Sequence, residues 1–442
     1  MNDALGKKAP MTRELLQAIR GSFEQIKDPR CRPGSISLAD ALMSAVAMFA
    51  LKFPSLLKFD EHRNEAVIRA NLRALYGVEQ APCDSQMREL LDGVDAERLT
   101  GAFAEVHRYL RQEGLLQDYR FLGGYLVSMD GTEPFESAKI HCAQCCERTL
   151  KNGEVRYYHQ GLTAAIVHPA HRQVFALPAE PIVRQDGKQK NDCERNALKR
   201  LLKKVRTIYP PQGAPKLIAV LDGLYGDGET IKSLKALGFS YIIVVKEGDH
   251  AALFEAIQAA LRAGKTEEFE YQDAQGVLHG FRYLNGVPLN QSHPDILVNY
   301  LDYWEIGKNG KEYHCIWITD IALSRETVEP VMRGGRARWK IENETFNTLK
   351  NQGYAFEHNY GHGQKSLATV LMQLMLLAFL VDQAQEHGCA WFQAARQRFR
   401  SRTSLWECLR ALFCYYLVES WEALWRAIAE RFKPVVIEWN TS

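Results

Sequence analysis

The sequence lacks an excess of charge of either sign. Its 442 residues include 55 Lys and Arg against 53 Asp and Glu, which gives a formal net charge of +2 at pH 7. A value so near zero neither requires nor excludes a nucleic-acid partner, so only local clusters of charge bear on that question. With 46% hydrophobic and 24% charged residues, the composition is that of a globular chain long enough for two or three domains.

The sequence also lacks the marks of a secretory leader, a membrane anchor and a disulfide framework. Its first residues contain no apolar stretch of the signal-peptide type. The most apolar run, 366–381, is short for a membrane span and includes Ser, Thr and Gln, so we expect a buried core helix and no membrane partner. The ten cysteines follow no framework spacing, which favours reduced thiols in the cytoplasm.

The chain divides into three regions by its patterns of apolar residues. Residues 1–120 predict successive helices, which suit a DNA-binding module and suit any helical bundle equally. Between residues 121 and 363, apolar runs that end in turns predict strands alternating with helices, hence a mixed α/β layer fold. Within it, about 250–318 alternates short strands with Gly and Asn turns and predicts a β-rich insertion. Residues 364–442 predict a helical C-terminal region.

Two apolar runs end in the same Asp-Gly pair, LVSMDG at Asp130 and IAVLDG at Asp222. Asp-Gly is also ordinary turn chemistry, so a turn is the alternative explanation for either residue alone. Ligands and catalytic groups in open α/β sheets gather at strand ends, and two such ends separated by one α/β unit favour a shared site. Two carboxylates there offer the hard oxygen ligands that Mg²⁺ prefers.

The segment 336–350, RARWKIENETFNTLK, has the apolar spacing of a helix but a high density of charge. Arg338 and Glu342 are four residues apart and share a face, whereas Glu344 is rotated by roughly 200° from Glu342. Only one of the two glutamates can therefore point at a common site. We expect Glu342 to supply the third carboxylate of a site for two divalent cations, and Glu344 to face solvent or a more distant shell.

Taken together, these residues resemble the Asp-Asp-Glu (DDE) transposases of bacterial insertion sequences. They look similar to the insertion-sequence-four family, whose signature around the glutamate is Tyr-x₂-Arg-x₃-Glu-x₆-Lys. Arg338 and Glu342 match the signature Arg and Glu, and Asp130 and Asp222 resemble the two aspartates. The resemblance covers about residues 121–363.

Two positions depart from that signature. Gly335 stands where the family has Tyr, and Leu349 stands where it has Lys. The lysine comes one position later, at Lys350, which on a regular α-helix is turned about 80° from the face of Glu342.

The resemblance implies a fold and a set of site residues. The fold is a ribonuclease H-like mixed sheet flanked by helices, with a β-rich insertion before the glutamate. Asp130, Asp222 and Glu342 would be both catalytic residues and metal ligands, with Mg²⁺ as the cofactor and Mn²⁺ as its substitute. Arg338 and Lys350 would bind phosphates near the scissile bond.

The resemblance also implies cut-and-paste transposition. The chain would cleave double-stranded DNA at transposon terminal inverted repeats and transfer the freed 3′ ends into target DNA. It would act as a homodimer in the DNA complex and be associated with the bacterial nucleoid. A catalytically inactive DNA-binding relative and a ribonuclease H-like nuclease without strand transfer are the alternatives.

A basic segment at 184–206 is a candidate DNA contact. Its helical part carries cations opposite an apolar face, and a solvated helix face is the alternative explanation. The candidates there are Lys199, Arg200, Lys203 and Lys204. Asp192 and Glu194 begin this helix, where we expect capping, with an accessory acid near the site as the alternative.

The sequence IHCAQCCER places His141, Cys142, Cys145 and Cys146 together. The spacing of Cys142 and Cys145 is zinc-like but has no second pair at the usual distance, so we expect reduced thiols. His159 and Cys193 would complete a site only if the fold brings them close. Farther along, Gly361 and Gly363 on either side of His362 argue against a helix that would place His358 and His362 on one face, so turn chemistry or DNA contact is expected there rather than metal.

Overall fold

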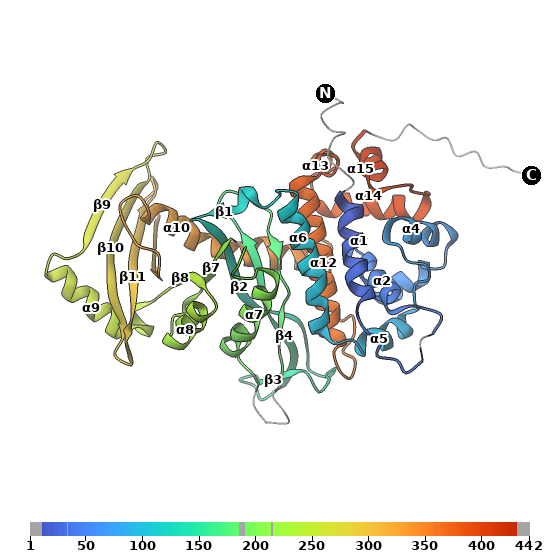
Figure 1. Ribbon diagram of the computed structural model, residues 1–442, viewed down its shortest axis with the longest axis horizontal. Coiled ribbons are helices and arrows are strands. Elements are labelled where there is room, and N and C mark those ends of the chain that lie inside the picture. The colour runs from blue at the N-terminus through green and yellow to red at the C-terminus, as the bar shows by residue number, and fades with distance from the viewer. Residues whose placement is uncertain (1–10, 33, 185–190, 214, 431–442) are drawn as a thin grey trace, which may run out of the picture.

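The computed structural model describes residues 11–32, 34–184, 191–213 and 215–430 (Figure 1). A mixed β-sheet runs through the middle of the molecule. Helices from both ends of the chain gather on one side of this sheet, and a β-rich lobe extends from the other (Figure 1). The expected α/β class is therefore confirmed.

The central strands have the order of a ribonuclease H-like sheet. β2 pairs antiparallel with β4 and parallel with β7, and β7 pairs parallel with β8. These strands are β2 Gly124–Ser137, β4 Val155–Val167, β7 Lys216–Leu221 and β8 Phe239–Val244. Shorter strands flank β2 and β4, namely β1 Arg120–Phe121, β3 Cys146–Thr149, β5 Phe175–Ala176 and β6 Glu180–Ile182.

The strands of the expected insertion continue this sheet. β12 pairs antiparallel with β8, and β11, β10 and β9 follow in that order. Their bounds are β9 Glu267–Gln272, β10 Leu278–Asn290, β11 His293–Ile306 and β12 Glu312–Thr319. The helix α9 Ala251–Arg262 precedes them, as expected, and packs against β10. The predicted strand-rich composition of this segment is confirmed.

The helices at the two ends of the chain pack against each other. The first group comprises α1 Met11–Glu24, α2 Leu38–Ala50, α3 Leu56–His62, α4 Ala66–Tyr76, α5 Asp84–Asp92, η1 Ala96–Leu99, α6 Thr100–Gln112 and η2 Gln117–Tyr119. The second comprises α12 Leu367–Gly388, α13 Ala390–Gln397, α14 Arg402–Tyr415 and α15 Trp421–Glu430. A buried ion pair joins them, Lys52 Nζ to Asp382 Oδ2 at 2.6 Å. Our division into separate 1–120 and 364–442 regions stays a prediction.

Helix α12 is the core helix that the sequence predicts. By length and composition it could cross a membrane, but 89% of its most apolar window is buried inside the protein. It packs against α2, α5 and α6 and against strand β5. Burial on all sides explains why its sequence shows no polar face.

The remaining helices lie on the sheet. α7 Glu194–Ile208 packs against β4 and β6, and α8 Gly228–Ala236 packs against β8; the short turns η3 Gly223–Tyr225 and η4 Glu247–Asp249 follow β7 and β8. The segment predicted as one helix at 325–352 is divided into four pieces. These are α10 Val328–Arg336, the 3₁₀ turn η5 Ala337–Trp339, the wide π turn η6 Ile341–Phe346 and α11 Asn347–Asn351.

Gly335 lets α10 approach the sheet closely. A Cβ atom at this position would lie 2.5 Å from Nε1 of Trp317, a fully buried side chain of β12. The position where the transposase signature has Tyr therefore has no room for a side chain here. Close packing at Gly335 fixes the height of α10 over β12 and β8 and so positions the turns that follow it.

Gly335→Ala should lower the free energy of unfolding, because the added methyl group would press on the Trp317 indole. Overpacking of this kind typically costs about 1–3 kcal/mol. Gly21→Ala on α1 is the matched control, since a Cβ there meets nothing within 4 Å and alanine gains up to about 1 kcal/mol of helix propensity. Urea unfolding followed by circular dichroism measures both variants. Equal stability gains in the two would contradict the close packing.

Candidate active site

Asp130 lies on β2, and Asp222 directly follows β7, the strand that runs parallel to β2. The β2–β7 register ends with Ser128 opposite Val220, so two residues further on Asp130 comes level with Asp222. Adjacent strands are about 4.8 Å apart, which brings the two carboxylates to one edge of the sheet. The alternative of a turn at the Asp-Gly pair of Asp130 is wrong, because β2 continues to Ser137 along β4. Asp222 does end its strand, and its Oδ1 accepts the N–H of Leu224 at 2.9 Å.

The segment with Arg338 and Glu342 lies over these strands. Ser128 and Asp130 are two residues apart on β2 and therefore face the same way. The Ser128 hydroxyl donates to the backbone oxygen of Arg338 at 2.9 Å. Arg338 Nη1 in turn lies 3.2 Å from Asp130 Oδ2 and 3.1 Å from Glu342 Oε1. One buried guanidinium thus joins two carboxylates that are distant in the sequence.

The π turn explains how Lys350 reaches the same face. On a regular α-helix a residue eight positions after Glu342 would be about 80° away from it. The wide turn at Ile341–Phe346 accommodates one extra residue, so Lys350 takes the orientation of a residue seven positions on, about 20° from Glu342. Glu342 and Lys350 accordingly line one cleft. Leu349, at the signature lysine position, is fully buried instead.

The cleft beside Asp130 is open and has a volume of about 630 Å³. Its lining includes Asp130, Gln160, Glu194, Glu342 and Lys350. The side chains come from β2, β4, the start of α7, the π turn and α11, so the cleft forms only when all of these elements pack.

Glu194 is a fourth acidic residue of this site. Its carboxylate packs so closely on Gly131 that a Cβ there would lie 2.3 Å from Glu194 Oε1. Tyr225 donates to Glu194 Oε2 at 2.9 Å, and Gln160 donates to Oε1 at 3.1 Å. We expected Glu194 to cap α7, but no side chain caps that helix and the carboxylate turns to the cleft. In the sequence, only the position of Glu194 at the start of the basic helix, after Asp192 and Cys193, indicated the alternative role of an accessory acid near the site.

The carboxylates of the site shift the acidity of Asp130. Burial raises the pKa of Asp130 to about 7, and a hydrogen bond with Glu342 and the charges of Glu342 and Asp222 act in the same direction. The Arg338 guanidinium opposes them. Burial also raises the pKa of Glu194, against the hydrogen bond from Tyr225. The sheet around Asp130 and the carboxyl end of β7 therefore carries more negative charge than the nearby Arg338 guanidinium balances.

These acidic residues fit divalent cations by their chemistry. They offer hard oxygen donors in a cleft that is rich in negative charge. Their oxygens do not form a compact group: among the described residues, the one group of three or more donors within 4.8 Å of one another is formed by cysteines and histidines elsewhere. Acids around a two-ion centre need not touch, because each ion contacts only some of them.

Glu344 lies apart from this site, as we expected from its rotation. Its Oε2 is 3.0 Å from Nε of Arg172, an ion pair at the surface. The neighbouring Lys340 is also turned away and donates to the backbone oxygen of His171 at 2.7 Å. Glu342 and Glu344 therefore have separate environments.

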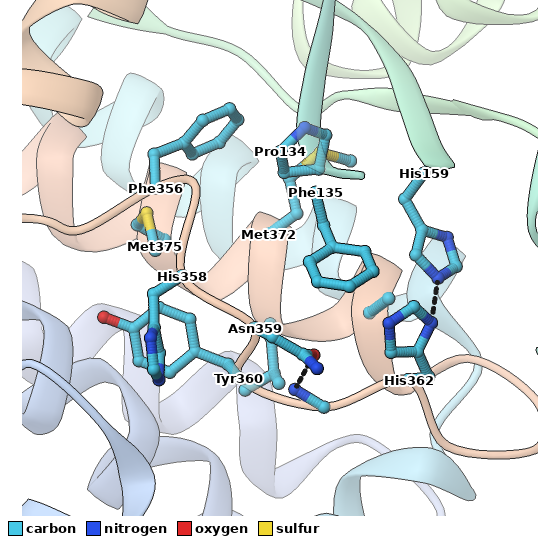
Figure 2. A pocket seen from close by; sticks show the side chains of 13 residues that line it. Pro134, Phe135, His159, Phe356, His358, Asn359, Tyr360, His362, Met372 and Met375 are labelled. Atoms are coloured by element: carbon cyan, nitrogen blue, oxygen red, sulfur yellow. Dashed lines mark hydrogen bonds between the residues drawn. The ribbon is translucent and has the colours of Figure 1, made fainter. Parts of the chain in front are cut away.

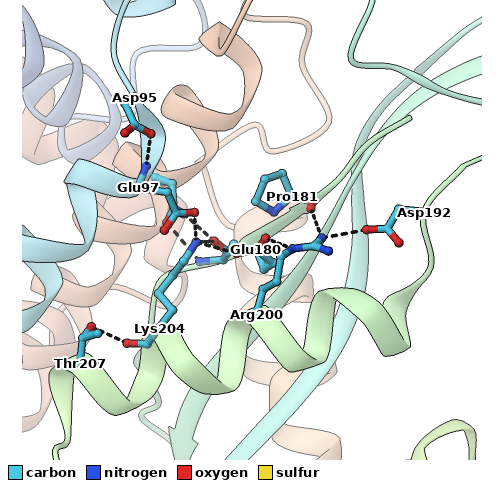
Figure 3. A network of polar contacts seen from close by, with 10 residues as sticks. Asp95, Glu97, Glu180, Pro181, Asp192, Arg200, Lys204 and Thr207 are labelled. Atoms are coloured by element: carbon cyan, nitrogen blue, oxygen red, sulfur yellow. Dashed lines mark hydrogen bonds and ion pairs between the residues drawn. The ribbon is translucent and has the colours of Figure 1, made fainter. Parts of the chain in front are cut away.

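The four basic candidates on α7 divide into two kinds. Lys199 and Lys203 are exposed and one turn apart. Figure 3 shows Arg200 and Lys204 converging on Glu180 instead. Lys204 Nζ lies 2.7 Å from both Glu97 Oε1 and Glu180 Oε2, and its side chain is 5% exposed. Such a buried ion pair argues against a DNA contact for Lys204.

Arg200 is held at both ends of its guanidinium. Its Nε contacts Glu180 Oε1 at 2.5 Å, and its Nη2 contacts Asp192 Oδ2 at 2.9 Å. These pairs make Arg200 a link between β6 and the start of α7. Lys188 and Lys190 of the same basic segment lie outside the described residues.

The cysteine and histidine residues gather in a way that the sequence showed only in part. Cys142, Cys145 and His159 come together as considered, but the fourth member is His362. Cys193 is exposed and is not in the group. The segment around His358 and His362 is not helical, as expected. His362, for which we expected turn chemistry or DNA contact rather than metal, has its donor atom within 4.8 Å of those of Cys142, Cys145 and His159.

Comparisons with known proteins include a weak structural likeness. No family model and no curated protein matches the chain. Among solved structures, the chain is similar to that of a piggyBac transposase synaptic complex with hairpin DNA, determined by cryo-EM. The identity is 10%, the TM-score is 0.39, and the alignment covers 93% of this chain and 78% of that chain. At this score the likeness carries no argument about function.

Asp130→Asn should stabilise the cation-free protein at pH 8 and lose this advantage as the pH falls. The folded pKa is raised from 3.8 to about 7, so ionisation of Asp130 costs stability above that pH, whereas below about pH 4 both folded and unfolded chains are protonated. The stability gain of Asp130→Asn should therefore develop as the pH rises from about 4 to about 7. Thermal unfolding in a chelator across this range measures it.

Glu344→Gln is the control for that experiment. It also removes one carboxylate of the same segment but breaks a surface ion pair with Arg172, so no rising gain is expected. A stability difference for Asp130→Asn that does not change with pH would contradict the raised pKa.

Proposed function

We propose that this protein is a DDE transposase related to the insertion-sequence-four family. It would cleave double-stranded DNA at transposon ends and join the 3′ ends to target DNA. The proposal rests on the signature residues of the sequence and on the chemistry of the cleft, and not on the weak likeness to a solved transposase.

One observation carries the proposal. Asp130 and Glu342 both contact Nη1 of Arg338, at 3.2 and 3.1 Å, although Asp130 precedes Arg338 by 208 residues. Asp222 directly follows β7, the strand parallel to β2, and its charge acts on Asp130. A surface ion pair would need no such convergence, since a pair on one helix already satisfies both charges. Acids that come from separate elements, with Asp130 and Glu342 lining one open cleft, suit phosphoryl transfer better than stabilisation.

Asp130, Asp222 and Glu342 would hold two Mg²⁺ ions, with Mn²⁺ as a substitute. When bound, such ions activate the attacking oxygen and stabilise the leaving one. The protein's own task is positioning, because phosphoryl transfer requires little covalent chemistry from side chains. Glu194, packed on Gly131 and held by Tyr225, would add negative charge at the same edge.

Arg338 and Lys350 would have different tasks. The Arg338 side chain is 7% exposed, and its guanidinium contacts the two carboxylates and the ring of Trp339, so it would orient the acids more than bind DNA. Lys350 lines the open cleft and pairs with the exposed Glu357 at 2.9 Å. A DNA phosphate could replace that carboxylate at little cost, because exposed pairs contribute about 0–1 kcal/mol. We assign the phosphate contact to Lys350.

DNA would also contact the exposed face of α7. Lys199 and Lys203 project from it near the start of the helix that carries Glu194. The helical N-terminal region would add specific DNA contacts, and two copies of the chain would hold two transposon ends. Phosphate contacts by lysine supply affinity without reading sequence.

Asp130→Asn, Asp222→Asn and Glu342→Gln should each abolish metal-dependent cleavage of DNA that flanks the coding region. Loss of one group that organises transition-state charge lowers rates by about a hundredfold or more. Glu344→Gln is the matched control and should retain most activity, because Glu344 pairs with Arg172 away from the cleft. Gel assays with Mg²⁺ and with Mn²⁺ measure cleavage.

Two outcomes of this assay would contradict the proposal. Retained cleavage in all three variants would remove the acids from the chemistry. Cleavage without joining of the 3′ ends, in a strand-transfer assay with target DNA, would identify a ribonuclease H-like nuclease instead.

Replacing Lys199 and Lys203 together by alanine should weaken DNA binding more at low salt than at high salt. Each lost phosphate contact reduces the slope of log affinity against log salt by about 0.9. Lys308 and Lys311, exposed on the turn between β11 and β12, provide a control pair of equal charge. Fluorescence anisotropy across a salt series measures the slope. An unchanged slope in the Lys199 and Lys203 variant would exclude this face.

A further inference from the structure

A second cluster of chemically active side chains lies outside the acidic cleft. It consists of Cys142, Cys145, His159 and His362, called the Cys/His cluster below. Figure 2 shows His159 and His362 pointing at each other from separate parts of the chain, with Phe135 beside them. The cysteines come from the connection between β2 and β3, His159 comes from β4, and His362 comes from the segment before α12.

The spacing of the four donor atoms is that of a tetrahedral zinc site. Zinc bonds of about 2.3 Å to sulfur and 2.0–2.1 Å to nitrogen require edges of about 3.8 Å between sulfurs, 3.5 Å between sulfur and nitrogen, and 3.3 Å between nitrogens. The two sulfurs are 3.8 Å apart. Three sulfur–nitrogen distances are 3.5 Å, and the two nitrogens are 3.1 Å apart.

No other interaction in the described residues accounts for this convergence. The polar contacts of His362 are all with the cluster, and its second ring nitrogen is buried without a hydrogen-bond partner in that part of the chain. The sulfurs are too far apart for a disulfide, whose S–S bond is about 2.05 Å. Without a cation, the four groups would be held only by weak thiol hydrogen bonds and by one hydrogen bond between the imidazoles.

We propose that the Cys/His cluster binds one zinc ion as a closed structural site. Two thiolates and two imidazoles in a tetrahedron are the donor set that selects zinc among common divalent ions. All four positions are filled by the protein, so the ion has no open position for a substrate. The site therefore serves the fold.

The zinc would fasten the segment after the π turn to the sheet. His159 and Gln160 are neighbours on β4 and so face opposite ways; His159 joins the cluster, whereas Gln160 lines the acidic cleft. His362 lies in the loop between α11, the helix that carries Lys350, and α12. One ion thus links the connection between β2 and β3, strand β4 and the segment before α12, and it does so whether or not the cleft is catalytic.

The zinc content of the purified full-length protein tests the proposal. We expect about one zinc per chain by mass spectrometry of the metal, retained during dialysis against a mild chelator. Cys142→Ser and His362→Ala should retain at least tenfold less, since losing even a supporting partner of a zinc ligand costs about 10–100-fold in affinity. Cys193→Ser and His358→Ala are matched controls outside the cluster and should retain the metal.

Cobalt substitution of the wild-type protein keeps the test independent of how the variants fold. Co²⁺ in the cluster should give the intense visible bands of tetrahedral coordination and the charge-transfer absorption of thiolate ligands. Added Zn²⁺ should displace it and remove these bands.

Three results would overturn the proposal. They are wild-type protein without zinc after expression in zinc-supplemented medium, bound cobalt without thiolate absorption, and equal zinc retention in Cys142→Ser and wild type. None of these readouts depends on DNA cleavage, so this proposal and the transposase proposal can fail separately.

Discussion

Parallel pairing of β2 with β7 is the constraint on which the acidic cleft depends. It brings Asp130 level with Asp222 and also presents Ser128 to the backbone of Arg338. Strand β4 reinforces this arrangement, because it pairs with β2 beyond the point where β7 ends. Asp130 is therefore held inside a continuous strand, with a stiff backbone on both sides. The pKa of its carboxyl rises because that rigid position is buried and shared with other acids.

The irregular segment from α10 to α11 supplies the side chains that line the other side of the cleft. Gly335 allows contact with Trp317, which sets α10 close on the sheet. The π turn that follows shifts the rotation of everything after it, so that Lys350 faces the cleft and Leu349 faces the core. Each departure from the transposase signature thus has a structural explanation in this segment. At position 335 there is no room for a side chain, and the π turn at 341–346 accommodates the one extra residue before the lysine.

Much of the fold and part of the site could be predicted from the sequence. Apolar periodicity identified the core helix, expected at 366–381 and observed at 367–388, and the strands that lead to Asp130 and Asp222, although β2 runs on past Asp130 to Ser137. The spacing of Arg338 and Glu342 indicated a shared face, which the ion pair between them bears out. Local patterns did not distinguish Lys199 from Lys204, since both fit the polar face of α7. Glu180, fourteen residues before that helix starts, decides that Lys204 is buried.

By itself the sequence determined which elements form and which residue types stand at their ends, because periodicity and turn chemistry act over a few residues. Only the tertiary structure decided that Glu194 joins the cleft, that the wide turn realigns Lys350, and that His362 meets Cys142 and Cys145. The physical reason is common to all three. Each depends on the distance between segments that are far apart in the chain. Strand pairing and helix packing set that distance, so it cannot be predicted from the residues next to each position.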